Sequence, residues 1–310
     1  MYLPYLRNRT NELFAVIEVA PKIVQHRLVV PIFHVIDTGS NFFKRAKRIA
    51  KEGQRFAIIL NSASVKSNPG FIAEFQKLRT DFPKLVIPAF EFDKNTTAID
   101  FSVFHASYGQ LLCLIVRRSD PPSINVVGAI STLGVAPIVV YLESEIGKLS
   151  ICSHSSGNIL LCQAFQKQTT NGAYPSRSNF LNYVDSYKAS HWAGIGDFTI
   201  VADEYKPGGG PASHVALHIT EPAQSNLVCN HFVSHSTAST AHIRFKYADA
   251  LAQLRSHALN NPTVFSTLGA SRFLALHTFP QLGVTKRWSI EHHLELMSTR
   301  MAHRGDVPFF

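Results

Sequence analysis

The stretch Val29-Val-Pro-Ile-Phe-His-Val-Ile36 and the residues 41–51 that follow it set the pattern of the first half of this chain. The first run is short, apolar and rich in β-branched residues, which is typical of a buried strand. In residues 41–51, apolar side chains fall on one helical face and basic side chains surround them. A buried strand followed by an amphipathic helix is the repeating unit of a parallel sheet.

The same strand–helix unit recurs along the chain. Short apolar runs predict further strands at Tyr2–Arg7, Arg55–Ser62, Leu85–Phe92, Leu111–Arg117, Ile138–Glu143, Asp197–Ala202 and Val215–Ile219. Helical spacing predicts helices over Asn11–Ala20, Gly70–Thr80, Thr96–Ala106 and Pro122–Thr132. Eight strands with intervening helices favour a (β/α)8, TIM-barrel-like α/β fold. An open doubly wound sheet is the alternative, although it leaves the second half of the chain unplaced.

The second half of the chain is less regular. Residues 148–190 are largely polar and are expected to be an insertion. Val215–Ile219 and Leu227–Val233, with residues 221–226 between them, suit an antiparallel hairpin. Helices are expected over Ile243–Leu259 and Ser289–Arg304. Because no change in composition marks a linker, residues 1–310 are expected to form a single domain.

The charge balance favours an anionic partner. The 310 residues are 45% hydrophobic and 16% charged, as in an ordinary folded protein, and 30 basic residues outnumber 21 acidic ones. A net charge of +9 suits a nucleic acid, a nucleotide or another phosphorylated ligand. A solvated basic surface gives the same charge, and the basic face of residues 41–51 is expected to be such a surface.

The sequence favours a cytoplasmic protein without a membrane partner. No apolar run approaches the ~20 residues that a membrane helix needs. The first residues lack the charged and apolar segments of a signal peptide. None of the four cysteines sits in a Cys-x-x-Cys pair, so no disulfide framework is expected and a reducing compartment suffices.

Polar residues at the carboxyl ends of the predicted strands are the first candidates for a site. Functional groups of α/β barrels gather at these ends. Arg7, Asn61 and Arg117 each follow a predicted strand and are expected to bind a ligand. Guanidinium groups grip phosphate with two hydrogen bonds, which suits an anionic ligand. Other strand-end residues of this kind are His34, Asp37, Glu91, Asp93, Arg118 and Glu143.

Residues 194–235 hold an aspartate and four histidines, the densest set of acid–base side chains in the chain. Strand periodicity places His214 with His218 on one face, and His231 with His235 on the face of the next strand. Two alternatives follow: a cluster that holds a divalent metal or transfers protons, or ordinary polar-face histidines. No His-Glu-x-x-His or Cys–His zinc spacing is present. Asp197, His218 and His231 are the candidate catalytic and metal-binding residues.

Two further motifs are weaker. Gly208–Gly210 lacks the Lys-Ser/Thr of a phosphate loop and is expected to be a turn or lid. His292 and His293 point about 100° apart on a helix, so at most one is expected to face a site.

The chain resembles the phage beta-protein group and its relatives in bacterial mobile and defence elements. The likeness is carried by Tyr2-Leu-Pro-Tyr-Leu-Arg-Asn-Arg9 with Glu12, by Phe165–Pro175, Gly196–Val201, Gly209–Ala212, His218-Ile219, His231–Ser234, Arg272-Phe-Leu274 and Trp288–Met297. It implies a barrel-like α/β fold and a setting beside a nuclease-like partner protein, and it supplies no reaction. Its motifs imply roles for Arg7, Arg9, Glu12, Asp197, His218, His231 and His292. His34 departs from the glutamate that relatives often carry.

Two functional hypotheses follow. In the first, a phosphoesterase- or hydrolase-type barrel of a mobile-element or anti-phage defence system acts on, or binds, a phosphate-bearing or nucleic-acid ligand. Arg7, Arg9, Glu12, Asn61, Arg117 and His292 would bind the ligand, Asp197 would be base or metal ligand, and His218 or His231 would transfer protons. In the second, the chain is a non-catalytic scaffold that binds the nuclease-like partner.

Overall fold

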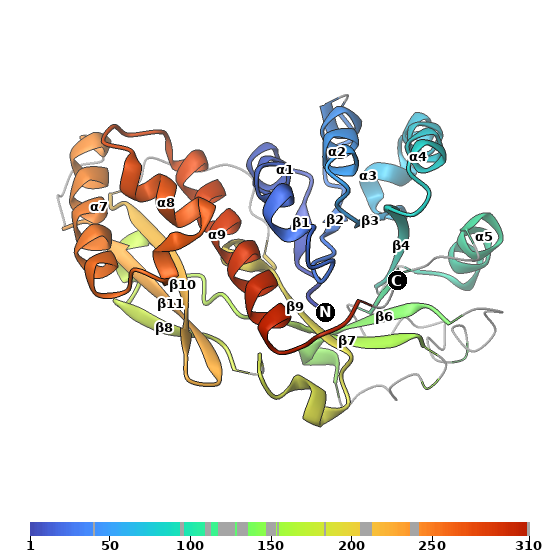
Figure 1. Ribbon diagram of the computed structural model, residues 1–310. Helices are drawn as coiled ribbons and strands as arrows, with labels where there is room; N and C mark the ends of the chain where they lie inside the picture. The colour runs from blue at the N-terminus through green and yellow to red at the C-terminus, as the bar shows by residue number, and fades with distance from the viewer. Residues whose placement is uncertain are drawn as a thin grey trace.

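The computed structural model describes most of the chain, and Figure 1 shows how its elements are arranged. The described residues are 1–39, 41–93, 96–108, 113–116, 136–146, 155–182, 184–204, 213–235 and 242–308, together with Gly128 and Ser153. The predicted helix Pro122–Thr132, the loop Gly208–Gly210 and Arg117 lie outside them, apart from Gly128. None of the described helices has the length and apolar character needed to cross a membrane.

A parallel sheet of eight strands forms the first part of the molecule, in the order β1-β2-β3-β4-β5-β6-β7-β9. These strands are apolar and short, as the sequence predicts for strands covered on both faces. Their bounds are β1 Tyr5–Arg7, β2 Ile32–His34, β3 Phe56–Ile59, β4 Val86–Phe92, β5 Cys113–Val116, β6 Ile138–Leu142, β7 Gly157–Cys162 and β9 Gly194–Asp197.

Helices cover the outer face of this sheet (Figure 1). Phe33, Phe56 and Phe90 pack there against the apolar sides of the helices. The opposite face holds a separate apolar cluster to which β1 through β7 all contribute, so the sheet is strongly curved. The helices are α1 Thr10–Ile23, α2 Asn41–Lys51, α3 Ala63–Lys66, α4 Pro69–Asp81 and α5 Ala98–Tyr108.

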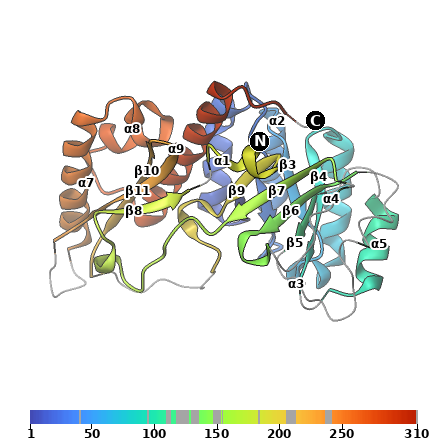
Figure 2. The ribbon, with the colours of Figure 1, turned by 90° about the horizontal axis from the view of Figure 1, so that it is seen from below.

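A second part, at the other side of the longest helix, is built on a three-stranded antiparallel sheet in the order β10-β11-β8 (Figures 1 and 2). Its elements are β8 Arg177–Leu181, β10 Ala216–Ala223, β11 Asn226–Val233, α7 Ile243–Asn260, α8 Leu268–Ala275 and α9 Leu282–His303. The predicted hairpin is confirmed, with His218 directly opposite His231. Helix α9 contacts α1, α8 and β10, and so joins the two parts.

The predicted closed (β/α)8, TIM-barrel-like fold is wrong. The structure is a curved parallel sheet in a mixed α/β fold, in which Tyr2 meets Ile195 of β9 through an isolated bridge instead of a strand ladder. Val215–Ile219, expected as the eighth strand, lies in the antiparallel sheet because its chain pairs with its own hairpin partner. The expected insertion at residues 148–190 supplies β7 to one sheet and β8 to the other. Short 3-10 turns lie before, within and after this region: η1 Glu143–Glu145, η2 Asn171–Ala173, η3 Tyr187–Ser190 and η4 Thr199–Val201.

The Gly194-Ile-Gly motif is explained by close backbone packing. A Cβ at Gly194 would lie 2.6 Å from the Met1 carbonyl oxygen, and one at Gly196 would lie 2.2 Å from that of Leu3. Glycine therefore lets β9 approach the first residues of the chain, where the Ile195 amide donates to Met1 O at 3.0 Å. These glycines serve packing, and Asp197 follows them at the end of β9.

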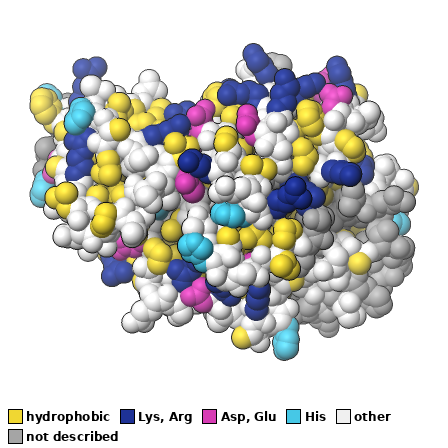
Figure 3. Space-filling model, viewed as in Figure 1, with side chains coloured by type: hydrophobic (Ala, Val, Ile, Leu, Met, Phe, Trp, Pro, Cys, Tyr) yellow, Lys and Arg dark blue, Asp and Glu magenta, His cyan; other side chains and the backbone are white. Residues whose placement is uncertain are grey.

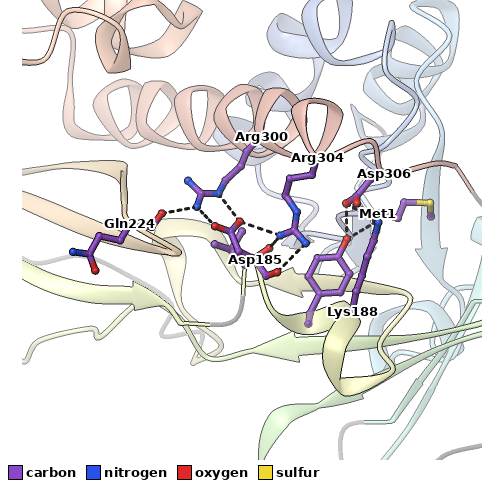
Figure 4. Close-up of polar contacts among 9 residues, drawn as sticks. Met1, Asp185, Lys188, Gln224, Arg300, Arg304 and Asp306 are labelled. Carbon is purple, nitrogen blue, oxygen red and sulfur yellow. Dashed lines mark hydrogen bonds and ion pairs between the residues drawn. The ribbon is translucent and has the colours of Figure 1, made fainter.

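The last turns of α9 are fastened to the loop before η3, as Figure 4 shows. Arg300 donates to both carboxylate oxygens of Asp185, at 3.1 and 2.6 Å, and Arg304 donates to the same carboxylate at 3.0 Å. Three residues beyond the helix end, Asp306 accepts from the Tyr187 hydroxyl at 2.5 Å and pairs with Lys188. This clamp fixes the carboxyl end of α9 against the segment that connects β8 to β9.

Replacing Asp185 by alanine is expected to lower the free energy of unfolding by about 1–3 kcal/mol, because two arginines lose their shared charged acceptor. Urea unfolding of the wild type and the variant measures the change. Asp81→Ala is the matched control, since Asp81 pairs with Lys47 on an exposed surface and little or no change is expected. Equal effects of the two substitutions would contradict a special role for the clamp.

Candidate functional site

A cavity of about 830 Å³ opens where three helices begin. Its wall includes the first residues of α1, α2 and α9, among them Thr10, Asn41 and Leu282. The first amides of a helix have no intrahelical acceptor, and the helix dipole makes that end positive. The cavity is therefore positive from its backbone alone, before any side chain is counted.

Basic side chains strengthen this positive character. Five basic side chains and the three carboxylates of Glu12, Asp37 and Glu204 line the cavity. The basic residues come from several segments of the chain: Arg7, Arg9, Arg45, Lys167 and Lys286. Arg7 is largely buried and donates to the carbonyl oxygens of Ala202 at 2.9 Å and of Asp203 at 2.5 Å. Its charge is thus held in place at the cavity wall.

The charges of Glu12 and Lys286 interact in this cavity, and each affects the pKa of the other. Burial raises the pKa of the Glu12 carboxyl, while the Arg7 backbone amide, which donates to it at 2.6 Å, and nearby cations oppose that shift. Loss of water around the Lys286 ammonium lowers its pKa; Glu12 opposes this, and Arg7, Lys167 and Arg9 add to it. Crowded cations that lower a lysine pKa are a sign of a site that a negative ligand would stabilise.

A second cavity of about 540 Å³ adjoins the first, because Arg7, Phe165 and Glu204 line both. At its wall the Tyr5 hydroxyl donates to Glu91 at 2.6 Å and lies 2.7 Å from His34 Nδ1. His34 ends β2 and Glu91 lies next to the last residue of β4, at the carboxyl ends where the sequence places them, whereas Tyr5 begins β1. Tyr5 was not among the expected site residues.

Asn61, expected to bind ligand, instead ties two strand ends together. Its amide nitrogen donates to the Glu91 carbonyl at 2.8 Å, and its oxygen accepts from the Glu91 amide at 2.9 Å. This reciprocal pair holds Glu91 in position beside Tyr5. Asn61 lines neither of the two cavities.

The histidine cluster on the antiparallel sheet reaches the first cavity through His218. Its Nδ1 lies 2.8 Å from Nδ1 of His231, and the Sγ of Cys229 lies 3.8 Å from the same His231 atom. Burial and the neighbouring His231 and Lys286 lower the pKa of His218 to about 3, and burial lowers that of His231 to about 4. His214 and His235 stand apart, with His235 paired to Asp249 on α7 at 2.8 Å.

Asp197 lies away from this cluster, in a fully buried network. Its Oδ1 accepts from the Tyr2 hydroxyl at 2.8 Å and from the Thr199 amide at 2.6 Å, and its Oδ2 accepts from His293 Nε2 at 3.1 Å. His293 Nδ1 lies 3.0 Å from Thr220 Oγ1. Asp197 lines neither cavity, and the structure groups His218 and His231 with Cys229 instead of with Asp197.

His292 is also buried and lies outside the two cavities, contrary to its expected role in ligand binding. Its Nε2 donates to the Thr220 carbonyl oxygen at 2.6 Å, and its Nδ1 accepts from Thr267 Oγ1 at 2.7 Å. Burial lowers its pKa to about 4, and the Thr220 carbonyl partly opposes this. Both adjacent histidines thus face the protein interior, which agrees with the expectation that at most one of them faces a site.

The structure therefore assembles only part of the expected site. Arg7, Arg9, Glu12 and His218 line one cavity, with His231 behind His218, while Arg117 lies outside the described residues. Sequence reasoning missed Arg45, Lys167, Lys286 and Cys229 as members of the site. A signal for Cys229 was present, since Cys229 and His231 are two apart and share a strand face.

The exposed basic face of α2 is separate from the cavity charges. Figure 3 shows Lys and Arg side chains gathered at the end of the molecule where α2 lies. Lys44, Lys47, Arg48 and Lys51 are exposed there, as expected for a solvated helix face. Of the basic residues of α2, Arg45 lines the cavity.

No protein-family model matches the chain, and no curated protein matches it significantly. The resemblance to the phage beta-protein group therefore stays a prediction.

Replacing Asp197 by alanine is expected to lower the free energy of unfolding by about 3–5 kcal/mol, because buried donors on Tyr2, Thr199 and His293 lose their acceptor. Chemical unfolding measures the loss. Asp249→Ala breaks a matched Asp–His pair whose His235 is 84% exposed, and it is expected to cost within about 1 kcal/mol. A stable Asp197→Ala protein would rule out the structural role.

His292 is expected to make stability depend on pH. Its pKa of about 4 in the folded protein lies below the ordinary value of about 6.5, so between these values the unfolded chain binds more protons and stability falls as pH falls. Glu291, with its pKa raised to about 7 by burial, acts in the opposite direction. Between pH 7 and pH 5, the wild type is therefore expected to lose about 1–2 kcal/mol of stability relative to His292→Gln. A difference independent of pH would contradict this.

Proposed function

We propose that the protein binds a phosphate-bearing ligand of nucleotide size in the cavity between α1, α2 and α9. The observation that carries the proposal is the meeting of three helix amino ends and five basic side chains at one cavity of about 830 Å³. Helix amino ends bind phosphate through free backbone amides, and arginine adds bidentate hydrogen bonds. A volume of this size is in the range of ligand sites in proteins, ~300–1,000 Å³.

The cavity also offers apolar surface for a base or sugar. Phe42, Phe165 and Tyr174 line it, and Tyr174 is only partly buried. Aromatic side chains bind nucleobases by stacking, which is sequence-tolerant because every base has a π-face. Positive charge at the helix ends and aromatic rings on another wall together favour a nucleotide over inorganic phosphate.

Hydrolysis of that ligand is no part of this proposal. Asp197, the candidate base, is enclosed in a structural network away from the cavity. A role in a mobile-element or defence system, a nuclease-like partner protein and a cytoplasmic setting stay predictions that rest on the sequence.

Lys286→Ala and Arg9→Ala are each expected to weaken nucleotide binding about tenfold to a hundredfold, because each removes a charged contact to phosphate. Isothermal titration of the full chain with each common nucleoside triphosphate measures the affinity. Raising the salt concentration is expected to weaken binding, as for any ligand held by charge.

Lys47→Ala is the matched control, because Lys47 lies on the exposed face of α2 and pairs with Asp81 outside the cavity. Its affinity for nucleotide is expected to equal that of the wild type. Failure of every nucleotide to bind, or equal losses in all three variants, would overturn the proposal. Binding of oligonucleotides alone, weakened equally by Lys47→Ala, would assign the charge to a nucleic-acid surface instead.

A further inference from the structure

We infer that His218, Cys229 and His231 form a binding site for a divalent metal ion of the zinc class, in the wall of the cationic cavity. The three side chains come from the paired strands β10 and β11. One ligand atom from each lies within 4.8 Å of the other two. Among the described residues this is the one group of three or more histidine, cysteine or acidic side chains that meets this condition.

Two of the three separations lie close to those of tetrahedral coordination. Zinc bonds of about 2.0 Å to nitrogen and about 2.3 Å to sulfur place two nitrogens about 3.3 Å apart, and a nitrogen and a sulfur about 3.5 Å apart. The observed distances are 2.8 Å between the two Nδ1 atoms and 3.8 Å between His231 Nδ1 and Cys229 Sγ. For these two pairs, shifts of about half an ångström reach the expected separations, and the ligand atoms of His218 and Cys229 lie within 4.8 Å of each other.

The surroundings of the cluster hold the ligands in place. Ser178 Oγ on β8 lies 2.8 Å from His231 Nε2, so it can accept from Nε2–H and leave the Nδ1 lone pair toward the cluster. The rings of Phe165 and Tyr174 pack edge-on against His218, and Tyr174 stacks on His231. Such hydrogen bonds and packing contacts orient metal-binding histidines in known sites.

The chemistry of the donors selects the metal. Two imidazole nitrogens and one thiolate are borderline-soft ligands, which favour Zn²⁺ over Mg²⁺ or Ca²⁺. On binding, the metal replaces the thiol proton of Cys229, which passes to solvent, and both imidazoles bind as neutral rings through Nδ1. Three protein ligands leave a fourth coordination position for water or another ligand, and His218, one of the three, also lines the cavity. An open position is typical of catalytic and ligand-binding zinc sites.

Titration of the reduced full-length protein with Co²⁺ under anaerobic conditions tests this inference. Cobalt replaces zinc in such sites, and a cysteine ligand gives an intense thiolate-to-cobalt charge-transfer band. One Co²⁺ per chain is expected, with the band present and bleached when Zn²⁺ is added. A wild-type protein that binds no Co²⁺, or that binds it without the band, would overturn the inference whatever the variants do.

Substitutions assign the ligands. Cys229→Ser is expected to abolish the band, and His218→Asn and His231→Asn are expected to weaken Co²⁺ binding at least a hundredfold, with circular dichroism confirming the fold. Ser178→Ala, which keeps all three ligands, is expected to weaken binding about tenfold to a hundredfold. His235→Asn and Cys113→Ser are matched controls from outside the cluster and are expected to bind Co²⁺ as the wild type does. A band that survives Cys229→Ser would refute the site.

These measurements use no nucleotide, and the nucleotide titrations use metal-free protein. The metal site and the proposed anion site are thus tested separately. Failure of one leaves the other standing.

Discussion

The hydrogen-bonded chain Tyr2–Asp197–His293–Thr220 joins the two parts of this molecule. Tyr2 belongs to the first residues of the chain, Asp197 ends β9, His293 lies in the middle of α9, and Thr220 lies in β10. All four are buried. A buried polar group without a partner costs more free energy than a hydrogen bond returns, so the network admits little displacement of any member. The position of α9 between the two sheets therefore depends on it.

Neighbouring residues of α9 extend the same constraint. His292 reaches the backbone of Thr220 and the side chain of Thr267, which caps α8. Glu291 accepts from Arg272 of α8 at 2.7 Å, and Arg272 also pairs with Glu18 of α1 at 3.0 Å. Three successive polar residues thus connect α9 to β9, β10, α8 and α1. Since the cavity lies at the amino ends of α1, α2 and α9, its shape follows from these contacts.

Local patterns in the sequence predicted individual elements well. Helix α2 spans the residues that its spacing predicts, and the hairpin that brings His218 opposite His231 follows from strand periodicity. The third member of that cluster, Cys229, could be found in the sequence only as an i, i+2 neighbour of His231. The hairpin register pairs Cys229 with Thr220, which places it diagonally across from His218.

The sequence did not predict how distant segments of the chain come together. Strand β7, Gly157–Cys162, lies within a polar stretch, so its apolar core Ile159–Leu161 was not counted among the strands. Periodicity also cannot tell which sheet a strand joins, and β10 was therefore assigned to a barrel. Helix α9 begins at Leu282 instead of Ser289, which hid Lys286 from the expected site. Asp197 has the residue type of a catalytic group, but its partners come from positions 2, 199 and 293, which spacing does not connect.

His218 links the cluster of possible metal ligands to the anion cavity, and the charges around it predict how binding at one site would affect binding at the other. It lines the cavity, lies against His231, and is close enough to Lys286 for that ammonium to lower its pKa. A divalent cation bound behind it would add positive charge to a wall that already holds Arg7 and Lys286. The added repulsion disfavours the metal in the empty cavity, whereas a bound phosphate removes that repulsion. Coupling between two sites is reciprocal, so if both proposed sites are occupied, each ligand would raise the affinity for the other by the same factor. Crowded cations around the cavity would thereby favour binding of metal and phosphate together over binding of either alone.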